Sequence, residues 1–233
     1  MITLTRILIN PQSRGGRRLL TNPQAMHAAV RASFPPDIDE TDARVLWRVD
    51  RHENTHTLYI VGPEEPDRRV IVDQAGWATR PGETADYEPF LDRLMRGQHW
   101  AFRLVANPVS AAAPEPGQKR GRVFPHVTAA QQEEWLAERA AASGFTLNLA
   151  HESDAGVPPS VLVTERRALT FSKDRGSNGR SGGRRREVTL RTARFDGVLE
   201  VTDVDALRGT LTHGLGRAKA YGCGLITLAR PAG

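Results

Sequence analysis

Residues 209–228, GTLTHGLGRAKAYGCGLITL, decide how the C-terminal end of the chain folds. The stretch is rich in glycine and carries two cations, Arg217 and Lys219, ahead of an apolar run. Glycine adopts positive φ at little cost, and successive backbone N–H groups in such turns form concave anion sites. Two interpretations are open: a helix that ends at Gly214 and leads through a turn into a final strand, or a surface that contacts phosphates. The pattern by itself favours the first.

Neither of the two common nucleotide-binding loops fits this stretch. A P-loop needs Gly-Lys-Ser/Thr after four free positions, and the sequence has no such run. A dinucleotide fingerprint needs a third glycine where Lys219 stands and a long α/β unit after it, but only residues 220–233 follow. A nucleotide cofactor is therefore not expected.

The excess positive charge of the chain is concentrated in one loop. The chain has 32 Lys and Arg against 27 Asp and Glu, which gives a net charge of +5. Residues 173–186, KDRGSNGRSGGRRR, hold six cations and one anion, so the remaining 26 cations and 26 anions cancel. A focused patch of this kind indicates a polyanionic partner, and the alternative is a solvated, flexible loop. The six cations are Lys173, Arg175, Arg180, Arg184, Arg185 and Arg186.

The composition indicates a cytoplasmic protein of one large or two small domains. The 233 residues are 39% hydrophobic, enough for a core, and contain no apolar run long enough to span a membrane. The N-terminus reads as a strand and lacks the features of a signal peptide. A single cysteine, Cys223, excludes an internal disulfide and is expected to be packed rather than reactive.

The first predicted helix carries a histidine at the edge of its buried face. Asn22 is suited to the N-cap, and Pro23 to the first helical position. His27 lies about 100° around the helix from Met26, at the flank of the buried stripe, and Arg31 lies one turn beyond it. His27 can thus border the core while its ring reaches a groove. The stripe itself consists of Met26, Val30 and Phe34.

The rest of the first half is predicted to be mostly β-structure. A basic loop, SRGGRR, with Arg14, Arg17 and Arg18, separates an opening strand from the helix. Alternating or β-rich runs then predict strands, and a short helix follows near residues 87–95. The predicted strands cover residues 3–9, 44–50, 56–62 and 69–74.

His52 to His56 match the zinc-protease pattern H-E-x-x-H. That chemistry needs the pattern on a helix, so that both imidazoles share one face. Here the pattern lies between two predicted strands, so we interpret it as a false match and expect no metal site.

The second half is predicted to repeat the order strand, helix, strand, strand, helix, strand. Thr128 and Gln131 form a capping box at the start of its first helix. The loop before that helix carries Lys119, Arg120 and Arg122, and the loop 173–186 forms the tip of a long hairpin. The predicted elements cover residues 99–105, 129–142, 160–171, 187–201, 203–213 and 224–229.

The economical architecture is α+β, with two tandem ferredoxin-like (RRM-like) domains. We expect the first domain at residues 1–95, with the helix that carries His27. The second is expected at residues 96–233, with the basic hairpin loop and the glycine-rich motif.

These parts together resemble the CasE family of CRISPR-associated endoribonucleases, the RNA-processing subunit of type I-E Cascade. The resemblance covers nearly the full length, and its most specific motif is GLGRAKAYGCGLITL at the C-terminal end. Further segments carry it in the same order: ILIN, NPQAMHAAV, FRLVANPV, QKRGRV and FDGVLEVTD.

The resemblance implies cleavage of the CRISPR repeat transcript at the base of a hairpin, after which the product stays bound within Cascade. The catalytic histidine of the family maps to His27. Some relatives have a tyrosine three residues earlier, where this chain has Gln24. The expected chemistry is metal-independent attack of the RNA 2′-hydroxyl, with His27 as general acid or base and no cofactor.

RNA contacts are expected from every basic segment identified above. The loop 173–186 would hold the RNA hairpin by its backbone, because the deep, narrow major groove of duplex RNA favours readout of phosphates and shape. Two other functions stay open: a catalytically silent subunit that holds RNA, and a zinc peptidase built on His52 and His56. The expected RNA-binding residues are Arg14, Arg17, Arg18, Arg31, Lys119, Arg120, Arg122, Arg217, Lys219 and the six cations of the loop 173–186.

Overall fold

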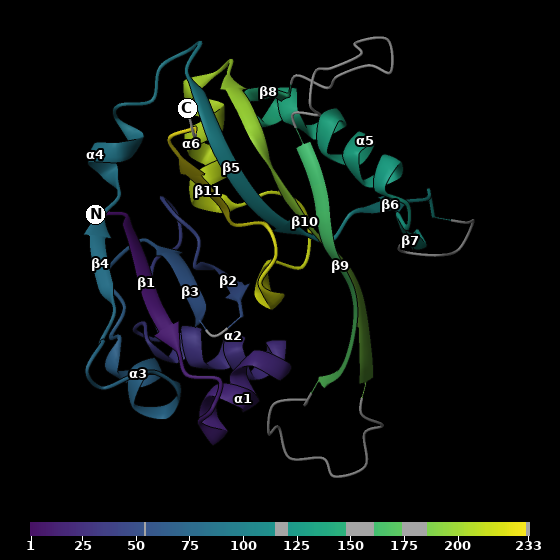
Figure 1. The fold of residues 1–233 in the computed structure, drawn as a ribbon. Coiled ribbons are helices and arrows are strands. Elements are labelled where there is room, and N and C mark those ends of the chain that lie inside the picture. The colour runs from purple at the N-terminus through teal and green to yellow at the C-terminus, as the bar shows by residue number, and fades with distance from the viewer. Residues whose placement is uncertain (54, 115–120, 148–160, 174–185, 232–233) are drawn as a thin grey trace.

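The computed structural model describes residues 1–53, 55–114, 121–147, 161–173 and 186–231 (Figure 1). Two tandem ferredoxin-like units follow one another, each built on an antiparallel sheet with helices on one side. The first sheet has the strand order β2-β3-β1-β4, and the second has the order β11-β5-β10-β8, with β9 paired to β10. The α+β class and the tandem ferredoxin-like architecture are confirmed. The division at residues 95 and 96 stays a prediction.

The first unit holds helices α1, α2 and α3 together on one side of its sheet (Figure 1). Its core combines strand residues such as Ile7 and Ile60 with Met26 and Val30 of α2. Its elements are β1 (Thr3–Ile9), α1 (Arg14–Thr21), α2 (Pro23–Ala32), β2 (Leu46–His52), β3 (Thr55–Gly62), α3 (Arg69–Ala75), β4 (Glu83–Asp86) and α4 (Glu88–Leu91).

The second unit is larger because two hairpins are added to its core. The long β9–β10 hairpin extends from the sheet and passes beside α1 and α2 of the first unit (Figure 1). The elements are β5 (His99–Ala106), β6 (Val109–Ala111), β7 (Val123–Pro125), α5 (Ala129–Ala140), the 3₁₀ turn η1 (Ala141–Ser143), β8 (Phe145–Leu147), β9 (Val161–Lys173), β10 (Arg186–Val201), α6 (Val204–His213), the 3₁₀ turn η2 (Lys219–Tyr221) and β11 (Ile226–Ala229).

The predicted basic loop SRGGRR is wrong, because Arg14–Thr21 form helix α1. The helix is capped by Ser13, whose hydroxyl accepts the Gly16 N–H at 2.9 Å. Its two glycines serve close packing, since a Cβ at Gly15 would stand 1.7 Å from the Gln74 carbonyl oxygen. A glycine pair usually indicates a loop, but here glycine is needed because backbone from a distant segment packs against the helix.

The predicted strand at residues 69–74 is also wrong, because Arg69–Ala75 form helix α3. Ile71, Val72 and Ala75 are buried at helical spacing, and α3 packs against α1 and β1. The strand that completes the sheet is instead the polar edge strand β4, which pairs with β1. Thr5 and Thr84 join the two strands by a side-chain hydrogen bond of 3.0 Å.

The helix boundaries expected in the second unit are confirmed at two positions. Thr128 and Gln131 form the capping box of α5, and α6 ends at Gly214. The H-E-x-x-H pattern lies in a hairpin, with His52 ending β2 and His56 in β3, so it lacks the helical face that zinc chemistry needs. Among the described residues, no helix is long and apolar enough to cross a membrane.

The glycine-rich loop after α6 joins the two units. Gly222 has φ +80°, and a Cβ there would stand 2.6 Å from the indole ring of Trp47 in β2. Gly214 has φ +76° and lies in the same way against Leu46. The glycines therefore allow close packing between the units, and Gly214 also ends α6, as the first interpretation of this motif expects.

Candidate functional site

His27 lies on α2, as the sequence predicts. Asn22 caps the helix by accepting the N–H groups of Gln24 and Ala25 at 3.0 and 3.2 Å. His27 is half-buried, between the buried Met26 and the exposed Ala28. The helix therefore holds the imidazole at the boundary between core and solvent.

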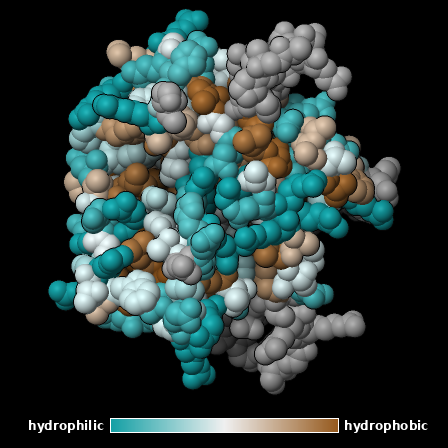
Figure 2. Space-filling view, in the orientation of Figure 1, coloured by the Kyte–Doolittle hydropathy of each residue, from teal (hydrophilic) through white to brown (hydrophobic). Residues whose placement is uncertain are grey.

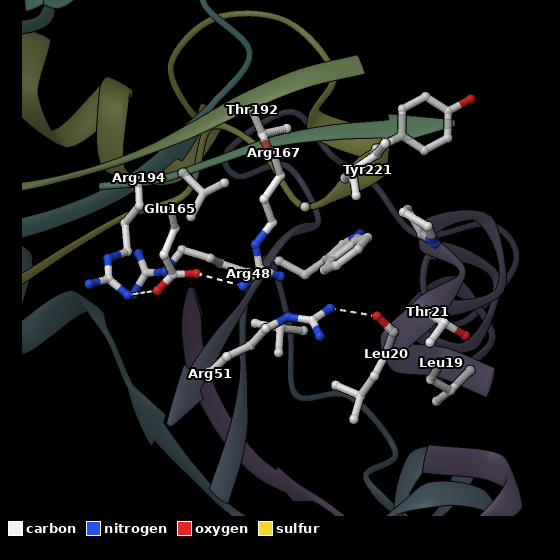
Figure 3. A pocket seen from close by; sticks show the side chains of 16 residues that line it. Leu19, Leu20, Thr21, Arg48, Arg51, Glu165, Arg167, Thr192, Arg194 and Tyr221 are labelled. Atoms are coloured by element: carbon white, nitrogen blue, oxygen red, sulfur yellow. Dashed lines mark hydrogen bonds and ion pairs between the residues drawn. The ribbon is translucent and has the colours of Figure 1, made fainter. Parts of the chain in front are cut away.

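Helix α2 borders a cavity between the two units through Pro23, its first residue. His27 is not one of the lining residues, but it lies four residues after Pro23 and so on the same side of the helix. The cavity has a volume of about 100 Å³ (Figure 3). Its walls come from the α1–α2 junction, β2 and β5, the β9–β10 hairpin and η2, and α2 itself packs against η2 and β9. The arrangement thus places basic groups from both halves of the chain beside α2.

Arg48 of β2 lies in the cavity wall and has a full set of partners. Its side chain is 1% exposed, and its guanidinium contacts Asp50 at 2.6 Å. The guanidinium also donates to the carbonyl oxygens of Arg103 and Leu225, at 2.8 and 3.0 Å, and to the Thr227 hydroxyl at 2.7 Å. Arg48 therefore links the first unit to β5 and to the last strand of the second.

Arg48 begins a chain of ion pairs that crosses the second sheet. Asp50 contacts Arg103 at 3.1 Å, and Arg103 contacts Asp196 at 2.5 Å. Asp196 contacts Arg194 at 2.6 Å, and Arg194 in turn pairs with Glu165 of β9. Alternating charges satisfy one another along this path, so these groups serve structure.

Asp50 is the acidic centre of that network. Burial by itself raises the pKa of Asp50, but the hydrogen bonds and charges of Arg48 and then of Arg103 outweigh it and leave the pKa below its ordinary value. Asp50 is therefore held as a carboxylate inside the interface.

Arg51 of β2 and Arg167 of β9 face each other across the cavity (Figure 3). Arg51 is half-buried and donates to the Leu20 carbonyl oxygen at 2.5 Å. Burial lowers its pKa, and the positive charge of Arg167 lowers the pKa further. Arg167 contacts Glu165 at 3.0 Å, but Glu165 is shared with Arg194. The cavity therefore holds more positive than negative charge.

The pKa of His56 is lowered by burial and by the same two arginines. Burial has the largest effect, and the charges of Arg51 and Arg167 lower the pKa further. The neutral imidazole is thus favoured beside the two guanidinium groups.

The predicted RNA-binding residues of the first unit lie on two helices. Arg14, Arg17 and Arg18 are exposed along α1. Arg31 on α2 forms an ion pair with Glu40, so part of its charge is already compensated. The structure therefore places the three cations of α1 on a helix next to the one that carries His27.

The predicted basic segments of the second unit are only partly described. Lys119, Arg120, Arg175, Arg180, Arg184 and Arg185 lie outside the described residues. Lys173 ends β9, Arg186 begins β10, and the two pair in register, which confirms that these strands form a hairpin; residues 174–185 lie outside the described residues. Arg122 is exposed beside the β6–β7 hairpin, which lies well away from α2 in Figure 1.

The two cations of the glycine-rich loop differ in their surroundings. Arg217 is exposed. Lys219 is half-buried and donates to the Gly216 carbonyl oxygen at 2.8 Å, and burial and then Arg44 lower its pKa. Cys223 is fully buried, which raises the pKa of its thiol to about 12 and agrees with a packing role.

Sequence reasoning missed Arg51, Arg167 and Tyr221, which all line the cavity. Each lies in a strand or a 3₁₀ turn, whereas the basic loops are recognisable because their charges are clustered in the sequence. The two arginines come from different halves of the chain, so only the packing of the units brings them together.

The molecular face of Figure 2 is mostly hydrophilic, with separate small apolar patches. One patch lies at the β6–β7 hairpin, where Val123 and Phe124 are 46% and 51% exposed. Among the described residues, no group of three His, Cys, Asp or Glu side chains is arranged to hold a metal ion.

Comparison with known proteins gives matches over nearly the whole chain. A family model described as "CRISPR associated protein" matches residues 3–230. The "CRISPR-associated endoribonuclease Cse3" of Thermus thermophilus is 30% identical over 228 residues, which cover 97% of this chain and 99% of that protein. The "CRISPR system Cascade subunit CasE" of Escherichia coli K12 is 33% identical over 144 residues, which cover 59% and 61%.

A solved structure has the same fold. The structure of Thermus thermophilus Cse3 bound to an RNA representing a pre-cleavage complex has a TM-score of 0.75 and 28% identity, and covers 98% of both chains. Fold and site define a protein of two ferredoxin-like units with a cationic cavity between them. The chain belongs to the CRISPR-associated protein family, and within it to the CasE type.

Proposed function

We propose that this protein is a metal-independent endoribonuclease that cleaves CRISPR precursor RNA within the repeat, at the base of the hairpin. His27 carries the proposal, because it lies on α2, the helix whose first residue, Pro23, lines the cationic cavity. The family supports it, since a relative of nearly full-length similarity is named a CRISPR-associated endoribonuclease.

The reaction uses the nucleophile that RNA itself supplies. The 2′-hydroxyl oxygen forms a bond to the adjacent phosphorus, and the bond from phosphorus to the 5′-oxygen breaks. One proton leaves the 2′-hydroxyl and one is delivered to the 5′-oxygen, which gives a 2′,3′-cyclic phosphate and a 5′-hydroxyl. His27 transfers one of these protons, a contribution typically worth about 10²–10⁴-fold in rate. Arginines stabilise the charge that develops on the phosphate.

Gln24 distinguishes this chain from relatives that have a tyrosine at that position. The Gln24 side chain is half-buried on the first turn of α2 and cannot supply a phenol. Any phosphate contact at this place has to come from an amide or from neighbouring arginines.

The product stays bound, and the protein serves as a Cascade subunit in the cytoplasm. The basic hairpin of β9 and β10 supports RNA retention, because it extends beside α2 and its tip carries the excess charge of the chain. The family supports the assembly, since a relative is named a Cascade subunit. The single, buried Cys223 agrees with a reducing compartment.

A single-turnover cleavage assay in EDTA tests the function. The substrate is the host repeat hairpin, with a 2′-deoxy nucleotide at the cut site as the chemical control. We expect the wild type to cleave only the all-ribose RNA and His27→Ala to lose about 10²–10⁴-fold in rate. His99→Ala is the matched control, because His99 is an exposed histidine on β5, 61% exposed, outside the cavity.

Tight binding without cleavage by the wild type would identify a catalytically silent subunit that holds RNA. Cleavage that needs an added metal ion would contradict the proposed chemistry. Equal cleavage by wild type and His27→Ala would return His27 to a structural role.

A further inference from the structure

The cavity between the units has the properties of a binding site for one anionic group. Arg51 has no carboxylate within ion-pair distance in the described part of the chain, whereas Arg48, Arg103 and Arg194 all have one. A half-buried guanidinium without a counter-charge is unfavourable. Its only hydrogen bond among the described residues goes to the Leu20 carbonyl oxygen.

Arg167 increases the imbalance instead of relieving it. Its guanidinium comes from β9 toward that of Arg51 (Figure 3), and each of the two residues belongs to a different unit. The positive charge of Arg167 disfavours the charged form of Arg51. Glu165 contacts Arg167 at 3.0 Å but is shared with Arg194, so it does not balance both facing arginines. A bound anion would pair with both and remove the repulsion.

A neutral donor lines the same cavity. Trp47 is 4% exposed, and its indole Nε1 has no hydrogen-bond partner among the described residues. An unpaired buried donor typically costs about 1–3 kcal/mol. The volume of about 100 Å³ suits one small group such as a phosphate, and not a base pair.

We propose that Arg51 and Arg167 form a clamp for one phosphate of the RNA backbone, next to the scissile linkage, and thereby fix the RNA between the two units. The proposal rests on the proposed function for the identity of the ligand. Pro23 in the cavity wall and His27 lie on the same side of α2, so the proposed RNA strand would run from the clamp along α2 toward His27. Arg51 and Arg167 are positioning residues, and neither transfers a proton.

Binding of a non-cleavable repeat hairpin, with a 2′-deoxy nucleotide at the cut site, tests the clamp. We expect Arg51→Gln and Arg167→Gln each to weaken binding about 10-fold and to reduce the salt slope by about one charge. Arg51→Lys keeps the charge but lacks the planar, bidentate guanidinium. Compared with Arg51→Gln, it should therefore restore the salt slope more than the affinity. Arg93→Gln is the matched control, because Arg93 is an exposed arginine just after α4 and is not one of the residues that line the cavity.

A chemical scan identifies the phosphate. Each linkage near the cut is replaced in turn by a neutral methylphosphonate. In the wild type, one linkage should cost about 10-fold in affinity, and the same linkage should cost nothing further in Arg51→Gln. Equal losses at every linkage in both proteins, or wild-type affinity of Arg51→Gln, would overturn the clamp.

The stability of the free protein separates a binding role from a structural one. Removing an unpaired charge should leave the unfolding temperature of Arg51→Gln equal to the wild type or higher. A fall of several degrees would show that Arg51 mainly supports Leu20, which also overturns the clamp. Failure of the wild type to bind the hairpin would contradict the proposed function, whereas normal cleavage with an unaffected Arg51→Gln variant would contradict the clamp alone.

Discussion

Arg48 and Arg51 belong to the same short strand, β2, yet their surroundings differ completely. Arg48 is 1% exposed and is matched by Asp50, two carbonyl oxygens and a hydroxyl. Within the described ranges, Arg51 has one carbonyl oxygen as acceptor and faces a second guanidinium. A charge with complete partners holds the units together, whereas a charge without a counter-ion is suited to a ligand that the free protein lacks.

The largest effect is expected from removing the counter-charge of Arg48. Asp50→Asn would leave the buried guanidinium of Arg48 without its carboxylate and should cost about 3–5 kcal/mol of unfolding free energy. Urea denaturation measures this. Glu83→Gln is the control, because Glu83 pairs with Arg6 at the surface and should cost less than about 1 kcal/mol. Similar small losses in both variants would contradict a structural role for the network.

A slightly smaller effect is expected where the glycine-rich loop meets β2. Gly222→Ala places a Cβ 2.6 Å from the buried Trp47 ring at φ +80°, so strain and overpacking should together cost about 2–4 kcal/mol. Gly209→Ala is the matched control. Gly209 lies inside α6, and a Cβ added there would meet nothing within 4 Å, so alanine should stabilise the helix by about 0.5–1 kcal/mol. Thermal unfolding of both variants shows whether the loss of stability comes from the contact with Trp47 or from replacing any glycine by alanine.

The smallest effect is expected in the dependence of stability on acidic pH. The pKa of Asp50 is lower in the folded state than its ordinary value of 3.8, so its stabilisation is complete above that value and is lost as the pH falls through the folded-state pKa. We expect the wild type to lose stability below about pH 4, and Asp50→Asn to lack this component. Urea midpoints measured from pH 6 to pH 2 test the difference. Parallel curves for the two proteins would remove Asp50 from the acid response.

Local signals predicted much of the fold. Strand β1, the N-cap of α2 at Asn22, the capping box of α5 and the end of α6 at Gly214 each depend on residues close in sequence. The errors occur where distant packing decides. Gly15 and Gly16 stand inside helix α1 because the backbone of other segments comes too close there for any side chain. The apolar run in α3 is helical because α1 and β1 cover one of its faces.

The candidate site divides in the same way. The sequence by itself determined that a histidine lies at the flank of a capped helix and that the charge excess lies at one hairpin tip, because helical periodicity and consecutive charges are local properties. Only the tertiary structure decided which arginines are matched and which are not. Arg51 and Arg167 belong to different units, and their like charges meet only when β9 packs beside α2, so no local pattern could show that Arg51 lies opposite a second guanidinium.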